Sequence, residues 1–364
     1  MGIAVRIRKK LSQSFTLELD FESSAGCLGI LGPSGSGKSM TLKCIAGIEK
    51  PDEGFIAVDG RTLFDSAKRV NLRPQERRVG YLFQNYALFP NMTVLENISA
   101  PPGAGRSPPE ASRWIERFGL SGLENRYPRQ LSGGQQQRAA LARMLISSPN
   151  AVLFDEPFSA LDSTLREYMQ LQLQKLLQDE EGGGAFFRNA ILVTHNRDEV
   201  YRLCRELAVM SGGRMIVKGD TRGVFQNPRF VNAALLTGCK NISPVRRLSE
   251  NEVFALDWGL PLRLNGSAGG ITHIGIRAHD FVPVRTPHGF NEVRISVSRL
   301  SSEPFEEVVL FTNADAKETS EKKEIWWKYS KYMEQSMPES LFLPPEALLP
   351  LSQASPRDHA ETDS

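Results

Sequence analysis

Residues 32–39 read Gly-Pro-Ser-Gly-Ser-Gly-Lys-Ser and fit the pattern G-x-x-x-x-G-K-[ST] of a phosphate-binding loop. The flanking sequence fits as well, because an apolar run at residues 27–31 predicts a buried strand and residues 40–46 predict a helix. Gly47 stands where a residue in the left-handed conformation would end that helix. Strand, glycines, lysine and serine together favour a nucleotide site over a plain glycine-rich turn. The stretch therefore predicts an α/β protein that binds a nucleoside triphosphate.

This phosphate loop offers several kinds of contact to a triphosphate. Its glycines let backbone N–H groups turn inward, and the N-terminus of the following helix attracts anions. Lys38 is expected to reach the β- and γ-phosphates, and the hydroxyl of Ser39 is expected to hold Mg²⁺. The residues expected to surround the nucleotide are Gly32, Pro33, Ser34, Gly35, Ser36, Gly37, Lys38, Ser39 and Met40.

Length and composition limit the class of protein. At 364 residues the chain is long for one domain and suits two. The 44 basic and 42 acidic side chains leave a net charge of +2, so no general basic field predicts a nucleic-acid partner. The four cysteines lack C-x-x-C spacing, which favours reduced thiols over a zinc site or a disulfide framework. With no secretory signal and no apolar run long enough to span a bilayer, any membrane association is expected to come through a partner.

The segments around the loop predict a mixed architecture. Residues 3–7 and 15–21 alternate apolar and polar side chains, as half-buried antiparallel strands do, and residues 55–58 predict another such strand. We therefore expect an antiparallel layer beside the nucleotide-binding sheet. Residues 92–147 predict a mostly helical insertion, which begins with a capping box at residues 93–96.

Three further strand ends carry polar side chains. The apolar strand at residues 151–154 runs into Asp155, which could hold Mg²⁺ opposite Ser39, and Glu156, which could orient and deprotonate a water. Gln84 ends a predicted strand at residues 77–84 and is placed to meet Mg²⁺ or water near the γ-phosphate. His195 follows a buried strand at residues 190–194, where it could contact the γ-phosphate. Each residue alone would be read as a solvated strand end.

A second candidate anion site opens the helix predicted at residues 135–146. Two glycines and a serine stand at its N-terminus, which is a favourable place for phosphate. A chain with one phosphate loop has no obvious use for a second such terminus in its own site. The residues concerned are Ser132, Gly133, Gly134 and Gln135.

Taken together, these segments resemble the ATP-binding cassette (ABC) ATPase family over about residues 1–235. The resemblance implies ATP and Mg²⁺ as cofactors, and a homodimer in which two cassettes pack head to tail. Each signature segment (residues 131–135) would then cover the nucleotide on the partner's phosphate loop, giving two composite sites. The other matching positions are the phosphate loop, the Q-loop Gln84, the acidic pair Asp155 and Glu156, the D-loop (residues 159–162) with Asp162, and the switch histidine His195.

Two positions depart from the family pattern. The family usually has an aromatic residue upstream that stacks on adenine, and Phe15 is the one candidate for it in residues 11–15. A core position in a strand is the other interpretation of Phe15. Met40 stands where the family often has a second hydroxyl, although Ser39 still fills the Mg²⁺ role.

The last third of the chain changes character. Short alternating runs in residues 238–350 predict a small β-barrel-like domain, which resembles domains of the TOBE or Mop kind, and residues 351–364 predict a disordered tail. Residues 237–243 and 275–280 resemble the junction and first barrel of importer ATPases in the molybdate group. Regulation and dimerisation are both open as roles for this domain. Its cations Arg277, Lys240 and His279 are candidates for contact with an anion, with a structural role as the alternative.

The resemblance implies the ATP-hydrolysing subunit of a membrane importer. Such a subunit works at the cytoplasmic face of the membrane, bound to permease subunits and served indirectly by an extracytoplasmic solute-binding protein. Molybdate is the leading candidate cargo, tungstate the next, and sulfate or another small solute the alternative. A soluble cassette that acts on DNA or ribosomes is disfavoured, since residues 84–131 leave no room for a coiled coil. A kinase or GTPase is disfavoured by LSGGQ and by the missing N-K-x-D motif, and an exporter by the appended domain.

Overall fold

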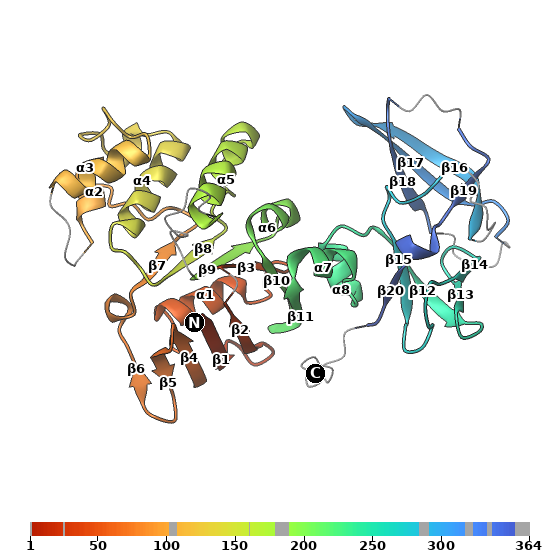
Figure 1. The fold of residues 1–364 in the computed structure, drawn as a ribbon, viewed down its shortest axis with the longest axis horizontal. Coiled ribbons are helices and arrows are strands. Elements are labelled where there is room, and N and C mark those ends of the chain that lie inside the picture. Colours follow the sequence, from red (N-terminus) through yellow and green to blue (C-terminus); the bar gives the residue numbers. More distant parts are fainter. Residues whose placement is uncertain are drawn as a thin grey trace. The chain divides into compact units, whose positions relative to one another are not determined.

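The computed structural model describes residues 2–24, 26–101, 108–159, 161–178, 189–283, 291–316, 323–332 and 337–353. The chain divides into two compact units, Met1–Thr221 and Arg222–Ser364 (Figure 1). The second unit therefore begins before the sequence-based boundary near residue 235, and the last helices before that boundary belong to it.

The first unit is built on a six-stranded sheet in the order β11-β10-β3-β9-β8-β7. Neighbouring strands are parallel except for the β10–β11 hairpin. β8 and β9 are buried along their whole length, as expected of apolar strands covered on both faces. The carboxyl ends of the parallel strands meet at one edge, which brings the phosphate loop, Asp155 and His195 to the same side. The strands are β3 (Gly26–Leu31), β7 (Val79–Leu82), β8 (Ala151–Asp155), β9 (Asn189–Thr194), β10 (Glu206–Ser211) and β11 (Arg214–Asp220).

The expected antiparallel layer is present as a second sheet in the order β2-β1-β4-β5-β6. The helix α1 (Lys38–Ala46) follows the phosphate loop (Figure 1). One apolar core joins it to both sheets. Gly47 ends α1 with φ of 79°, as the sequence predicts. The strands of this layer are β1 (Ile3–Lys10), β2 (Thr16–Ser23), β4 (Glu53–Val58), β5 (Arg61–Asp65) and β6 (Val70–Asn71).

Two further helices, α5 (Ser163–Gln178) and α6 (Arg197–Leu203), pack against each other, and α6 also packs on β3 and β9. The helical insertion is confirmed, with the predicted capping box at Thr93 and Glu96. It contains α2 (Val94–Ser99), α3 (Pro108–Arg117) and α4 (Gly133–Leu145), and the short 3-10 turns are η1 (Pro74–Glu76) and η2 (Pro128–Gln130).

The strand predicted at residues 77–84 is shorter than expected. β7 covers only four residues, because Arg77 lies in the turn after η1 and buries its side chain instead of pairing. Its guanidinium donates hydrogen bonds to the carbonyls of Cys44 and Ile45 at the end of α1, each at 2.8 Å. At its other end β7 stops at Leu82, so Gln84 lies two residues beyond the strand rather than in it.

The second unit is rich in strands, as the sequence predicts. Two antiparallel sheets, in the orders β14-β13-β12-β15-β20 and β18-β17-β16-β19, share one apolar core that includes Trp258, Phe311 and Trp327. Residues 354–364, most of the predicted tail, lie outside the described residues. The elements are α7 (Thr221–Gln226), which starts at the boundary, α8 (Val231–Leu236), β12 (Asn241–Arg247), β13 (Glu252–Ala255), β14 (Leu260–Arg263), β15 (His273–Ile276), β16 (Glu292–Ser302), β17 (Glu306–Asn313), β18 (Ile325–Ser330), β19 (Ser340–Phe342), η3 (Pro345–Ala347) and β20 (Leu349–Leu351).

Among the described residues, no helix is both long and apolar enough to cross a bilayer.

Candidate active site

The phosphate loop forms a tight cradle between β3 and α1. A side chain at Gly32 would place its Cβ 2.6 Å from the carbonyl oxygen of Met210 and from Ser36 Oγ, so only glycine fits there. Gly37 has φ of 101°, a conformation that other residues rarely adopt. The hydroxyl of Ser36 is buried and has no hydrogen-bond partner among the residues that the structure describes. An unpartnered buried hydroxyl beside the free N–H groups of a helix N-terminus suits a bound anion.

Lys38 is held inside this cradle. Its Nζ donates hydrogen bonds to the carbonyls of Gly32 at 2.8 Å and Pro33 at 3.0 Å. Burial lowers the pKa of Lys38, and the negative charges of Glu156 and Asp155 oppose that shift. The lysine is thus a buried cation next to two carboxylates, and phosphate oxygens could replace the carbonyls as acceptors.

The two residues predicted to hold Mg²⁺ from opposite sides are in contact. Ser39 Oγ donates to Asp155 Oδ1 at 2.8 Å, and the phenol of Tyr81 donates to Asp155 Oδ2 at 2.8 Å. Burial, with Asp155 adding to it, raises the pKa of Tyr81, so Tyr81 stays a neutral donor. A hydroxyl and a carboxylate are oxygen ligands of the kind Mg²⁺ prefers, and they fit this ion together with phosphate oxygens.

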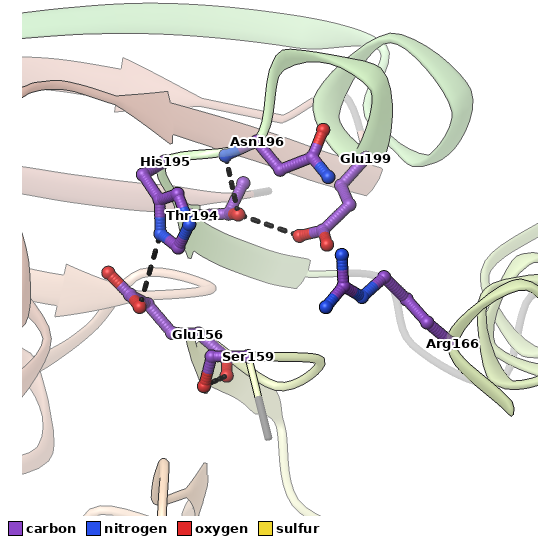
Figure 2. A pocket seen from close by; sticks show the side chains of 7 residues that line it. All are labelled: Glu156, Ser159, Arg166, Thr194, His195, Asn196 and Glu199. Atoms are coloured by element: carbon purple, nitrogen blue, oxygen red, sulfur yellow. Dashed lines mark hydrogen bonds and ion pairs between the residues drawn. The ribbon is translucent and has the colours of Figure 1, made fainter. Parts of the chain in front are cut away.

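Glu156 and His195 form the second contact of the site. His195 Nδ1 lies 3.3 Å from Glu156 Oε2 (Figure 2). Glu156 has φ of 46°, and its N–H donates to the carbonyl of Val193 on β9 at 2.9 Å. Such strained residues cluster at functional sites. The His195 side chain is 66% exposed and the Glu156 side chain 23%, so both can be reached from solvent.

Gln84 joins this group through the D-loop. Its Nε2 donates to Ser159 Oγ at 3.4 Å, and Ser159 Oγ donates to the backbone carbonyl of Glu156 at 3.0 Å. The structure thus links Gln84, Ser159 and Glu156 in one chain of hydrogen bonds.

The signature segment bonds within its own turn. Ser132 Oγ accepts from the N–H of Gln135 at 3.3 Å, and Gln135 Oε1 accepts from the N–H of Ser132 at 2.9 Å. This capping box starts α4, and Gly133 and Gly134 form its first turn. A side chain at Gly134 would clash with Leu165, since its Cβ would lie 2.6 Å from Leu165 Cδ2. The segment is therefore a helix N-terminus on the helical insertion rather than part of the cradle at residues 32–39.

Three other candidates occupy more ordinary positions. Asp162 Oδ1 accepts from the N–H of Leu165 at 2.9 Å and so caps α5. The Met40 side chain packs against the apolar core, which leaves its backbone as the part able to meet a nucleotide. Phe15 is half-buried beside the cradle, with its ring 3.7 Å from where a Cβ on Gly37 would lie.

The candidate anion ligands of the second unit are each engaged by the protein. Arg277 donates to the carbonyl of Thr237 at 2.7 Å, and the ammonium of Lys240 lies 4.2 Å from the centre of the Trp326 ring. His279 Nε2 contacts Glu306 Oε1 at 2.8 Å. We therefore assign no anion site to these cations.

Some residues at the site were missed by the sequence analysis. A cavity of about 40 Å³ lies beside Glu156 and His195 (Figure 2). Thr194 is the last residue of the buried strand β9, so its place at a strand end could have identified it in the same way as His195. Arg166 and Glu199 stand inside helices, where a charged residue is usually solvated. The lining residues are Glu156, Ser159, Arg166, Thr194, His195, Asn196 and Glu199.

Comparison with known proteins gives consistent matches. The sequence pattern described as "ABC transporter" matches residues 16–159. The chain is 37% identical over 266 residues to the sulfate/thiosulfate import ATP-binding protein CysA of Brucella melitensis, covering 71% of this chain and 70% of that protein.

Two other relatives match shorter parts of the chain. The spermidine/putrescine import ATP-binding protein PotA of Acidothermus cellulolyticus is 41% identical over 226 residues, 60% of this chain and 56% of that protein. The molybdenum import ATP-binding protein ModC of Paramagnetospirillum magneticum is 36% identical over 218 residues, 59% of this chain and 58% of that protein. The chain thus matches little more than half the length of either relative.

A solved structure is similar to part of the chain. It is the dimeric post-hydrolysis state of the ATP-binding cassette MJ0796 bound to ADP and Pi. The similarity has a TM-score of 0.50 at 29% identity and covers 61% of this chain and 99% of that one.

Proposed function

The chain belongs to the ABC transporter family of ATP-binding proteins, and on this premise we propose that it hydrolyses ATP to drive import across a membrane. One observation carries the proposal. The cradle with Lys38, the Ser39–Asp155 contact and the Glu156–His195 contact lie at one edge of one sheet. Phosphoryl transfer to water needs these parts together: a phosphate clamp, metal ligands and a base.

The chemistry follows from the side chains. Lys38 would exchange the carbonyls of Gly32 and Pro33 for β- and γ-phosphate oxygens. Glu156 would take the proton of the attacking water, and His195, 3.3 Å from it and exposed, would orient the γ-phosphate. Ser39, Asp155 and Gln84 would hold Mg²⁺, which neutralises phosphate charge when bound.

The working unit in this proposal is a homodimer with two composite sites. The helix terminus at residues 132–135 is a phosphate-binding terminus outside the chain's own cradle, and a second copy could place it over the nucleotide. The similar cassette MJ0796 is dimeric. The dimer would bind permease subunits at the cytoplasmic face of the membrane, with an extracytoplasmic binding protein supplying the cargo.

The proposed cargo is an oxyanion, with molybdate as the first candidate and tungstate close to it. A molybdenum import protein and a sulfate/thiosulfate import protein are both relatives, so sulfate is the second candidate. The spermidine/putrescine relative makes a polyamine the third. Uptake of labelled molybdate, sulfate and spermidine into cells with and without this gene decides among them. If cells without the gene lose only molybdate uptake, molybdate is supported as the cargo. If they lose only sulfate uptake or only spermidine uptake, that solute is the cargo and molybdate is not.

The enzymatic part of the proposal is tested by Lys38→Ala in the full-length chain. The substitution removes the buried cation of the cradle, so ATP hydrolysis should fall to background. Lys43→Ala on the same helix is the matched control and should keep the wild-type rate. Normal turnover by Lys38→Ala would contradict the assignment of the site.

A further inference from the structure

Glu199 bonds Thr194, the residue before His195, and through it is linked to Asn196, the residue after. This side chain on α6 is 4% exposed, and its Oε2 accepts a hydrogen bond from Thr194 Oγ1 at 2.6 Å. Thr194 Oγ1 in turn accepts from the N–H of Asn196 at 3.0 Å (Figure 2). The buried carboxylate thus holds Thr194, and the Thr194 hydroxyl in turn bonds across His195 to the backbone of Asn196. That carboxylate lies outside the phosphate cradle.

Arg166 reaches the same cavity from the opposite helix. Its Nη2 donates to the carbonyl of Leu161 in the D-loop at 2.9 Å, and its Nε is buried with no hydrogen-bond partner among the described residues. Figure 2 shows the guanidinium directed toward Glu199 across the cavity of about 40 Å³. That volume has room for at least one ordered water, which needs polar partners of this kind.

The charges around Glu199 explain why it needs such a partner. Burial raises its pKa, and the charge of Glu156 acts in the same direction. The hydrogen bond from Thr194 and the charges of Arg166 and His195 act against that shift. A buried carboxylate in this position is costly unless it is hydrogen-bonded and paired.

We propose that Arg166 and Glu199 form a positioning pair, bridged by cavity water, that sets His195 in register with Glu156. The pair joins the D-loop, through the carbonyl of Leu161, to the loop on either side of His195. This role rests on the proposed function, because it concerns the geometry of ATP hydrolysis. Both side chains line the cavity beside His195 and Glu156 and lie outside the loop at residues 32–39, so the pair acts through His195 and Glu156.

The kinetic test compares Arg166→Gln, Glu199→Gln and the double variant in the full-length chain. Each single change should lower kcat about 10- to 100-fold, the cost of a small misplacement of reacting groups. KM for ATP should stay within about twofold, since the cradle is untouched. The double variant should be no slower than the slower single variant, because both changes break one unit. Independent losses that multiply would overturn the pairing.

Arg202→Gln is the matched control. Arg202 also joins α6 to α5, through Gln170 Oε1 at 3.1 Å, but it does not line the cavity. If helix packing alone mattered, this variant would slow hydrolysis as much as Arg166→Gln does. If Arg166 and Glu199 act as a pair, Arg202→Gln should keep the wild-type kcat. An equal loss of kcat in Arg202→Gln and Arg166→Gln would overturn the proposal.

Amide hydrogen exchange without nucleotide provides a readout that does not depend on hydrolysis. Arg166→Gln should speed exchange at residues 194–197, and Glu199→Gln should speed exchange at residues 161–166. Changes confined to each variant's own helix would overturn the pair. A wild-type chain that hydrolyses no ATP would contradict the proposed function instead, and the exchange result would still decide whether the two loops are joined.

Discussion

Replacement of Arg77 by methionine tests how the phosphate-loop helix is held in place. Arg77 is 1% exposed and donates four hydrogen bonds from its guanidinium. Two go to the carbonyls of Cys44 and Ile45 in the last turn of α1, where a helix leaves carbonyls without partners. A cation at this end also opposes the negative pole of the helix dipole. Methionine keeps the hydrocarbon part of the side chain and removes all four donors.

The expected loss follows from the burial of these bonds. The bonds to Cys44 and Ile45 are fully buried, whereas those to Leu72 and Asn71 are partly buried and could be replaced by water. A hydrogen bond to a charged group contributes about 1.5–3 kcal/mol, so the two buried bonds together are worth about 3–6 kcal/mol. For a unit of this size that corresponds to a decrease in Tm of about 6–24 °C.

Urea and thermal unfolding of the full-length protein measure this loss. The matched control is Arg78→Met, because Arg78 is the next residue and is exposed. The control should change the free energy of unfolding by no more than about 0.5 kcal/mol. A loss below about 1 kcal/mol for Arg77→Met, or an equal loss for Arg78→Met, would refute the account of how α1 is anchored.

Three other changes have defined outcomes. Burial raises the pKa of Cys44 and Cys239 to about 11, so the native protein at pH 8 should react with Ellman's reagent far more slowly than in denaturant, and fast reaction would contradict the burial. The pKa of Glu199 is raised in the folded state, so its ionisation destabilises the fold once the pH exceeds the ordinary glutamate value, and no such penalty exists below it. The free energy of unfolding of Glu199→Gln, measured by urea titration, should therefore rise relative to that of the wild type as the pH goes from 4 to 7.5. A relative decrease would contradict the raised pKa. Gly32→Ala places a Cβ 2.6 Å from backbone and should weaken ATP binding by at least about tenfold in calorimetry, whereas unchanged affinity would show that the cradle can relax.

The residues at strand ends were predictable from the sequence. The phosphate loop, Asp155, Glu156 and His195 each follow an apolar run, and parallel strands bring such ends to one edge. The structure brings Ser39 into contact with Asp155 and Glu156 into contact with His195. Their roles in hydrolysis remain predictions.

The contacts between distant segments were not predictable. Tyr81 and Asp155 are 74 residues apart in the sequence. Nothing in their local sequence indicates that the phenol donates a hydrogen bond to the carboxylate. Arg166 and Glu199 look like ordinary charged residues of amphipathic helices, and only the fold turns them toward a shared cavity.

Arg77 and the second unit show two other limits. The local pattern predicted a strand that starts at Arg77, whereas Arg77 is buried against the end of α1 and the strand begins only at Val79. In the second unit, proline lies inside two strands, Pro244 in β12 and Pro261 in β14, where a local pattern argues against a strand. Pairing with β13 stabilises both of them.

The central claim is that Glu156 is the base for ATP hydrolysis in a composite dimer site, and Glu156→Gln tests it most directly. The substitution keeps the shape of the side chain and leaves the Ser39–Asp155 contact intact. Hydrolysis should fall by about 10²–10⁴-fold. The variant should bind ATP and run as a dimer in size-exclusion chromatography with light scattering only when ATP and Mg²⁺ are present. A variant that stays monomeric with ATP while hydrolysing it at the wild-type rate would contradict the account.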